Sequence, residues 1–245
     1  MDQEYTYNPD QYWQNTEDSY PYYPTVRHRK RFILRALKKH IQAPVFSAFD
    51  FGCGEGSLLK SIQNKFGLTQ EHIGGCDISK KATERAQENL RSPHLIHALY
   101  PKLQHPFDAI TCCEVLEHTT EYADILRWMY ENLKSGGVMI VTTQTGRIHA
   151  SDRYTGHTQH FRIRELRSLL EKMGLEILQA RLWGWPLFTI QKYLTNVRFD
   201  RIRKNYLEGT LTLRKKIVFT IAYFVYVLHD LIPFGPQIYI VARKP

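Results

Sequence analysis

Residues 45–59 read VFSAFDFGCGEGSLL, a short apolar run followed by three alternating glycines and the start of an apolar helix. An apolar run bounded by glycines is typical of a buried parallel strand, so the turn is predicted at the carboxyl edge of a sheet, where open α/β folds bind ligands. Gly52 and Gly54 let a ligand approach the backbone, but Ser57 stands where a dinucleotide fingerprint has Gly or Ala. A ligand without a pyrophosphate does not need that glycine, and Asp50 at the strand end suits a cationic ammonium.

Two later segments extend this pattern. Residues 72–79 (HIGGCDIS) read as a second strand that ends in an acidic residue, and residues 107–118 (FDAITCCEVLEH) read as a fourth strand with its exit loop. Together with the D-x-G-x-G-x-G pattern that begins at Asp50, these segments resemble the motifs of class I S-adenosylmethionine (SAM)-dependent methyltransferases.

The resemblance implies an α/β fold: a seven-stranded Rossmann-like methyltransferase sheet with helices on both faces, an antiparallel last strand and a long insert before it. After the first strand, we expect strands at 72–77, 94–99, 108–113, 138–143, 175–183 and 237–243. We expect helices at 56–66, 80–90, 121–134 and 161–173, with a glycine cap at 134–137. The chain then divides into an arm and basic helix (1–44), a SAM-binding core (45–183), an insert (184–235) and the last strand (236–245).

The same resemblance assigns the contacts to SAM. Asp50 and the backbone of Gly52–Gly54 would hold the methionine end, Asp77 would accept both ribose hydroxyls, and Ile78 would lie against the adenine. Many family members carry an acidic or amide group for the adenine amine after the third strand. Residues 98–100 (ALY) offer none, so that contact is unassigned.

Residues 113–118 (CEVLEH) are similar to the E-x-L-E-H element of the ubiquinone-biosynthesis O-methyltransferases. In that group, the residue before the first glutamate contacts SAM, and so does an arginine in the helix before the first strand. The resemblance therefore implies Cys113 and Arg29 as cofactor contacts, although Arg27 or Arg31 could take the place of the arginine.

Methyl transfer to a hydroxyl requires a group that accepts the hydroxyl proton. His118 and His160 are predicted at the carboxyl edge of the sheet and are the candidate catalytic residues, with structural roles as the alternative for each. Glu114, Glu117 and His118 are spaced i, i+3, i+4, and with His160 they resemble the metal ligands of small-RNA 2′-O-methyltransferases. Because many metal-free methyltransferases have the same element, we predict no metal and keep a divalent metal as the alternative.

The charge of the chain is uneven. The net charge is +9, and basic residues cluster at 27–39 and at 198–216, where they could meet nucleic acid, anionic lipid or an acidic metabolite, or form solvated faces. Residues 1–24 are rich in tyrosine and show no helical period, so we expect an arm with Tyr12–Trp13 as an anchor over the site. Residues 25–41 are predicted to form a basic amphipathic helix.

The chain begins with the polar, acidic residues Met1–Glu4, and its four cysteines show no C-x-x-C spacing. This pattern favours small packed thiols in a reducing compartment over a metal or redox site. We expect a cytoplasmic protein.

The insert of about 50 residues is too long for an idle loop. Its apolar run, residues 217–228, is shorter than the roughly 18 to 20 residues of a membrane-spanning helix. We predict a buried helix. The alternative is a lid or interfacial helix that meets an apolar acceptor or contacts a membrane peripherally, which Arg214–Lys216 would favour.

The sequence thus predicts a SAM-dependent methyltransferase that acts on a small-molecule acceptor, with a hydroxyl oxygen as the favoured target and an apolar or lipid-linked intermediate as one acceptor class. Two alternatives remain. The first is a metal-assisted RNA 2′-O-methyltransferase that uses the basic clusters. The second is a non-catalytic subunit that keeps the fold. The sequence makes no prediction about oligomeric state.

Overall fold

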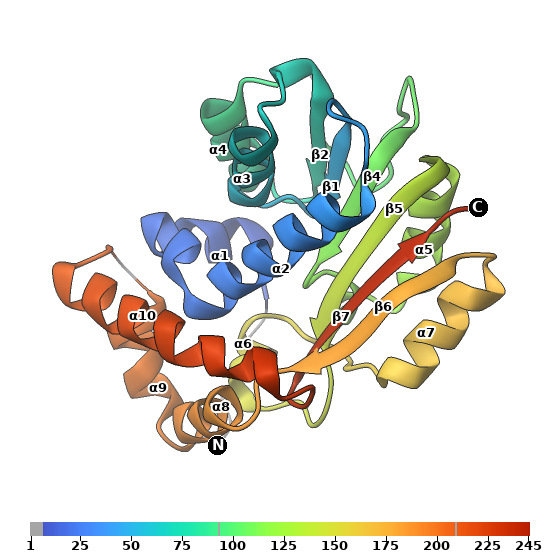
Figure 1. Ribbon diagram of the computed structural model, residues 1–245. Coiled ribbons are helices and arrows are strands. Elements are labelled where there is room, and N and C mark those ends of the chain that lie inside the picture. The colour runs from blue at the N-terminus through green and yellow to red at the C-terminus, as the bar shows by residue number, and fades with distance from the viewer. Residues whose placement is uncertain (1–6, 93, 209) are drawn as a thin grey trace.

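The computed structural model describes residues 7–92, 94–208 and 210–245, and it contains one seven-stranded sheet of order β3-β2-β1-β4-β5-β7-β6 (Figure 1). The strands are β1 (Ala48–Phe51), β2 (Ile73–Asp77), β3 (His94–His97), β4 (Phe107–Cys113), β5 (Leu133–Gln144), β6 (Glu176–Trp183) and β7 (Gln237–Arg243). β7 is antiparallel to both of its neighbours, while β1 to β5 pair in parallel. The predicted sheet with an antiparallel last strand is confirmed.

Helices cover both faces of this sheet, as predicted. On one face, α2 (Pro24–His40), α3 (Ser57–Phe66) and α4 (Lys80–Leu90) pack around a buried cluster that includes Ile33, Leu59 and Leu90. On the other face, α5 (Tyr122–Glu131) and α7 (Ile163–Lys172) pack on a second cluster. The short α6 (Ala150–Tyr154) lies in the loop after β5.

β1 is buried along its whole length, because its side chains enter both clusters: Phe49 and Phe51 one, and Ala48 the other. The glycine turn follows Phe51, the last residue of β1, and so lies at the carboxyl edge of the sheet. Gly52 has φ +74°, and a Cβ at this position would collide with Val115. A side chain is excluded at Gly52 by both the left-handed backbone and the lack of space.

The N-terminal arm differs from the prediction. Its described part is helical, with α1 (Pro9–Thr16) and the 3₁₀ helix η1 (Glu17–Tyr22) ahead of α2. Residues 1–6 lie outside the described residues. The helical period was missed because tertiary contacts, rather than an apolar stripe, hold the segment: Trp13 is buried, and its backbone oxygen accepts a hydrogen bond from Arg85 at 2.8 Å.

The predicted glycine cap after α5 is also wrong. α5 ends at Glu131, and residues 134–137 belong to β5. Gly136 N–H donates to Lys244 O, and Lys244 N–H donates to Gly137 O, so the two glycines tie β5 to the segment after β7. The residues that suggest a helix end locally thus form a long-range pairing.

Helices form the insert between β6 and β7: α8 (Leu187–Val197), α9 (Phe199–Ile202), a π-helical turn η4 (Arg203–Leu207), α10 (Leu213–Tyr226) and a 3₁₀ turn η5 (Val227–Leu231). The prediction that residues 217–228 form a buried helix is wrong. Phe219 and Tyr226 are buried in that run, but most of its apolar side chains are exposed. Within the described residues, no helix has the length and apolar character needed to cross a bilayer.

Candidate active site

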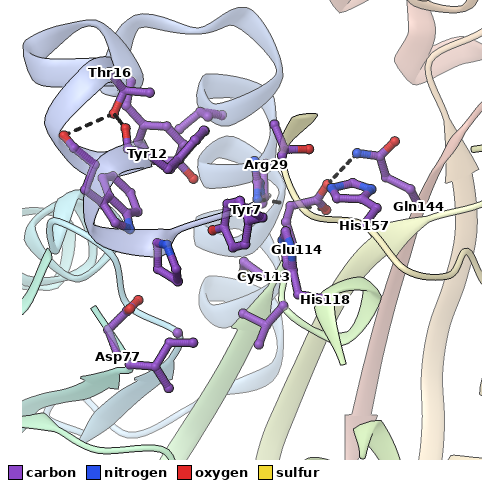
Figure 2. A pocket seen from close by; sticks show the side chains of 18 of the residues that line it. Tyr7, Tyr12, Thr16, Arg29, Asp77, Cys113, Glu114, His118, Gln144 and His157 are labelled. Atoms are coloured by element: carbon purple, nitrogen blue, oxygen red, sulfur yellow. Dashed lines mark hydrogen bonds and ion pairs between the residues drawn. The ribbon is translucent and has the colours of Figure 1, made fainter. Parts of the chain in front are cut away.

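A cavity of about 520 Å³ opens at the carboxyl edge of the sheet, between the strand ends and the N-terminal segment (Figure 2). Five aromatic side chains of that segment line it: Tyr7, Tyr12, Trp13, Tyr20 and Tyr23. Strand ends and exit loops supply most of the opposite wall, with Gly52, Asp77, Ile78, Ala98, Leu99, Cys113, Glu114 and His118. The prediction that the glycine turn and the ends of β2 and β4 meet is confirmed by this geometry.

Asp77 is held by the backbone on both of its oxygens. Its Oδ2 accepts a hydrogen bond from Gly54 N at 2.9 Å, and its Oδ1 accepts one from Ser79 N at 2.8 Å. Burial nevertheless raises the pKa of this carboxyl. Each carboxylate oxygen can accept a second hydrogen bond, so Asp77 retains acceptor capacity toward the cavity.

Asp50 lines a smaller cavity of about 40 Å³ that adjoins the large one through Arg29, Gly52 and Cys113. The Thr111 hydroxyl donates to Asp50 Oδ1 at 2.6 Å. Burial raises the pKa of Asp50 to about 7, although Thr111 and Arg29 oppose this shift. A cation in the small cavity would stabilise the ionised form.

The wall beyond Asp77 is apolar. Ile78 is 55% exposed and lines the cavity together with Ala98 and Leu99. The sequence left the contact to the adenine amine open. In the structure, the residues at this point present apolar surface to the cavity.

Arg29 and Glu114 both line the cavity and form an ion pair, with 3.9 Å between Nη1 and Oε1. Arg29 Nη1 is buried and has no hydrogen-bond partner among the described residues. Glu114 has φ +55°, a strained backbone conformation for a side chain of its size, and it accepts hydrogen bonds from Thr142 at 3.1 Å and Gln144 at 3.3 Å. Of the three candidate arginines, Arg29 is the one that lines this cavity.

The aromatic segment is fixed above the glycine turn. The hydroxyl of Ser79 and the backbone N–H of Lys81 donate to Asp10 at 2.5 and 3.1 Å. Trp13 lies so close over Gly54 that a Cβ on this glycine would collide with the indole. The expected anchoring of Trp13 over the site is therefore present, but Asp10, which joins α1 to the start of α4, was not identified from the sequence.

His118 and His157 line the cavity, whereas His160 stands behind His157. Tyr7 stacks on His118, with 5.4 Å between ring centroids. Burial lowers the pKa of His118, and it lowers the pKa of His157 to about 2, with the neighbouring histidines adding to the second shift. These imidazoles are neutral near pH 7.

The tautomers of two of these histidines follow from their contacts. A carbonyl oxygen only accepts, so His160 donates Nδ1–H to Gly146 O at 3.1 Å. His160 Nε2 must then accept from His157 Nδ1–H, also at 3.1 Å. His157 therefore keeps an unprotonated Nε2. Sequence reasoning missed His157, although the H-x-x-H spacing with His160 could have identified it.

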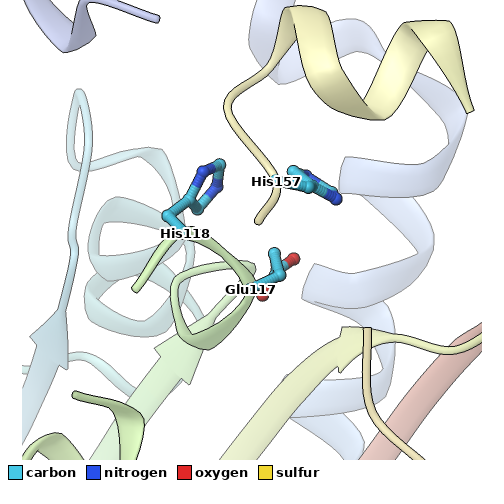
Figure 3. A group of neighbouring side chains, drawn as sticks. All are labelled: Glu117, His118 and His157. Atoms are coloured by element: carbon cyan, nitrogen blue, oxygen red, sulfur yellow. The ribbon is translucent and has the colours of Figure 1, made fainter. Parts of the chain in front are cut away.

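A metal could be held by Glu117, His118 and His157, whose ligand atoms lie within 4.8 Å of one another (Figure 3). Glu117 Oε1 and His118 Nδ1 are buried and have no partner among the described residues. Two histidines and a carboxylate are a donor set that suits divalent transition metals. The predicted alternative set, which included Glu114 and His160, is not the one that the structure brings together.

A second candidate group comprises Asp152, His157 and His160. Here Lys192 Nζ lies 2.9 Å from Asp152 Oδ1 and already supplies a positive charge. Our prediction of no metal stays a prediction.

Comparison with known proteins places this geometry in a family. A family model described as a methyltransferase domain matches residues 25–180. The ubiquinone biosynthesis O-methyltransferase of Caulobacter vibrioides is 32% identical over 98 residues, which cover 38% of this chain and 39% of that protein. The enzyme of the same name from Chromobacterium violaceum is 26% identical over 115 residues, which cover 44% and 48%. The chain therefore matches less than half the length of these relatives.

Solved structures show the same fold at low identity. An N-methyltransferase from Bradyrhizobium japonicum, in complex with S-adenosyl-L-homocysteine, has a TM-score of 0.59 and 16% identity, with 98% of this chain and 100% of that chain covered. Magnesium protoporphyrin IX methyltransferase from Synechocystis, with bound SAM, has a TM-score of 0.57 and 14% identity, with 89% and 79% covered. Because the family model matches more than half of the sequence, the chain belongs to the methyltransferase domain family, and the solved structures share its fold.

Proposed function

We propose that this enzyme transfers a methyl group to a hydroxyl oxygen of a small, largely apolar acceptor. The observation that carries the proposal is the cavity itself. From the glycine turn it extends to a part lined by Tyr7, Tyr12, Phe188, His118 and His157, called the acceptor chamber below, in which the histidines are neutral. The O-methyltransferase names of the relatives support the oxygen target. Tyr7, Tyr12 and Phe188 line the chamber, which favours an aromatic or lipid-linked acceptor over a highly charged one.

The residues at the turn fit SAM. The left-handed backbone of Gly52 and Gly54 forms the tight turn at the cavity, with Val115 and Trp13 packed against it. Asp77 has spare acceptor capacity for two hydroxyls. Asp50 offers a buried carboxylate to an ammonium, and Nη1 of Arg29, which makes no hydrogen bond to any described residue, can donate to a carboxylate. When bound, SAM supplies a methyl group on a sulfonium whose positive charge already activates the leaving group.

Ile78 and Cys113 complete the proposed cofactor contacts. Ile78 offers an apolar face for the adenine beside Ala98 and Leu99. Cys113 lines both cavities, between Asp50 and the acceptor chamber, and burial raises the pKa of its thiol. The thiol therefore stays protonated and competes poorly as a methyl acceptor.

His118 is the proposed proton acceptor. It lines the chamber, and burial keeps it neutral at pH 7, as a base must be before it takes a proton. His160 is placed to act through His157, because the hydrogen bond from His157 Nδ1–H fixes the orientation of the His157 ring. In this arrangement His118 removes the hydroxyl proton, and His157 and His160 hold that side of the chamber.

The RNA alternative loses its main structural support. Its metal set required Glu114 beside Glu117 and His118, but Glu114 turns toward Arg29, Thr142 and Gln144. The intact hydrogen bond from Gly54 N to Asp77 supports a working cofactor site over the non-catalytic alternative.

Calorimetry with SAM and S-adenosylhomocysteine tests the cofactor assignment, and labelled SAM with metabolite extracts tests the acceptor. Asp77→Ala should weaken SAM binding by roughly 30-fold or more, because two hydrogen bonds to a charged group are lost. Asp124→Ala, which removes an exposed carboxylate paired with Arg127, is the matched control and should bind normally. If the intact protein bound neither ligand, the proposal would be wrong.

A further inference from the structure

We propose that the insert and the adjoining face of α2 form a binding surface for an anionic lipid bilayer. The family model matches residues 25–180, which include α2 but not the insert. Most of the proposed surface therefore lies outside the matched region. The inference does not rest on the acceptor proposed above, because binding to a bilayer can be measured without turnover.

The first observation is a pair of exposed apolar stripes. On α8, Ile190, Tyr193, Leu194 and Val197 follow the spacing i, i+3, i+4, i+7, and each is 49% to 64% exposed. This is the spacing of one helix face. A soluble helix normally buries such a face, but here the face is turned to the outside.

The same pattern recurs on α10 and the turn after it. Ile217, Ile221, Phe224 and Leu228 are separated by four, three and four positions and are 52% to 66% exposed. The two helices meet where Phe188 at the start of α8 contacts Tyr226 at the end of α10, with 5.9 Å between ring centroids. The stripes thus belong to neighbouring helices, at the lower left of Figure 1.

The second observation is a cationic groove beside α10. Arg27, Lys30, Arg31, Arg35 and Lys38 of α2 line a groove of about 550 Å³ with Lys65, and Tyr223 of α10 forms part of the same wall. α2 carries seven Lys and Arg residues and no Asp or Glu, while the insert carries eight Lys and Arg against three Asp and Glu. Within the described ranges, Lys38 and Lys65 make no ion pair with a carboxylate.

The acidic residues of the insert are already neutralised. Asp230 pairs with Arg31 and Arg35, and Arg203 pairs with both Asp200 and Glu208. Exposed apolar helix faces beside a groove with more cations than carboxylates suit the surface of an anionic bilayer, where hydrocarbon lies below negative headgroups. Nucleic acid would use the charge but not the apolar stripes. A second copy of this chain would place like charges against one another.

The surface also adjoins the acceptor chamber. Phe188 of α8 and Leu207 of η4 line the chamber, so the same insert contributes to its wall and carries the exposed stripes. An apolar acceptor dissolved in the bilayer would therefore meet the protein next to the cavity.

The test is co-sedimentation of the full chain with vesicles of phosphatidylcholine alone and of phosphatidylcholine with phosphatidylglycerol. We expect binding to the anionic vesicles that weakens as salt is raised, and much weaker binding to neutral ones. Ile221→Asp and Leu194→Asp, one on each helix, should each reduce binding roughly tenfold, because a charge enters the apolar layer. Val45→Asp changes an equally exposed apolar residue before β1 and should bind like the wild type.

The cationic groove is tested separately. Lys38→Glu with Lys65→Glu should reduce binding to anionic vesicles tenfold or more, whereas Lys102→Glu, an exposed lysine elsewhere, should have little effect. Circular dichroism and SAM binding confirm that each variant is folded. The proposal is overturned if the wild type ignores anionic vesicles or if both aspartate variants still bind. It is also overturned if sedimentation equilibrium shows that these variants dissociate a dimer of the free protein.

Discussion

Replacing Arg29 by methionine separates a cofactor contact from a structural ion pair. The guanidinium is buried, its Nη1 has no hydrogen-bond partner among the described residues, and its distance to Glu114 is 3.9 Å, longer than a hydrogen bond. If Nη1 donates to the carboxylate of SAM, the variant loses one charge-assisted hydrogen bond. That bond is worth about 1.5–3 kcal/mol, which corresponds to a roughly 10- to 150-fold loss of SAM affinity.

The assay compares SAM with 5′-methylthioadenosine, which has the adenine and ribose but lacks the amino-acid end. Calorimetry should show the full loss for SAM and a change within about threefold for methylthioadenosine. Glu114 keeps its hydrogen bonds from Thr142 and Gln144, so urea unfolding should show a cost below the roughly 3–5 kcal/mol of breaking a fully buried pair. An equal loss for both ligands would show that Arg29 only shapes the pocket and would refute the assignment.

Two histidine substitutions test the chemistry and the electrostatics of the chamber. His118→Gln should lower kcat by about 10²-fold while SAM affinity stays within a few-fold, and the wild-type rate should fall with acid below the ordinary histidine range; unchanged turnover would exclude His118 as the base. The folded-state pKa of His157, about 2, lies below the unfolded value near 6.5, so the stability from its neutral form is lost as pH falls through that range. Urea unfolding should show that His157→Asn removes about 2 kcal/mol of the stability lost between pH 8 and pH 5, and an unchanged pH dependence would contradict this.

The part of the site that the sequence predicts is the part built from strand ends. Gly52 and Asp77 could be placed because a buried parallel strand, a glycine turn and a strand-end carboxylate leave a local pattern, and parallel strands bring their carboxyl ends to one edge. Gly54 N and Asp77 are 23 positions apart, but the βαβ unit brings them to 2.9 Å. Local chemistry and topology together were enough.

The roof of the cavity could not be predicted in the same way. The Asp10–Ser79 hydrogen bond joins residues 69 positions apart, and the stacking of Tyr7 on His118 joins residues 111 positions apart. Neither contact leaves a periodic signal, because each depends on how the N-terminal segment packs against the carboxyl edge of the sheet. His157 was missed for a related reason: the loop after β5 offers several histidines, and only the fold determines which one faces the cavity.

The insert shows the limit of hydrophobicity as a guide to burial. A near-continuous apolar run is typical of a helix enclosed on all sides, and residues 217–228 have that composition. Enclosure requires neighbours on every face, yet α10 packs mainly against α2, which is strongly basic and meets it through contacts such as Arg27 over the Tyr223 ring at 3.9 Å. The side chains on the remaining faces of α10 stay uncovered within the described chain. The apolar composition that predicted a core helix is therefore better explained by contact with a lipid bilayer than by contact with the rest of the protein. The vesicle experiment tests this explanation.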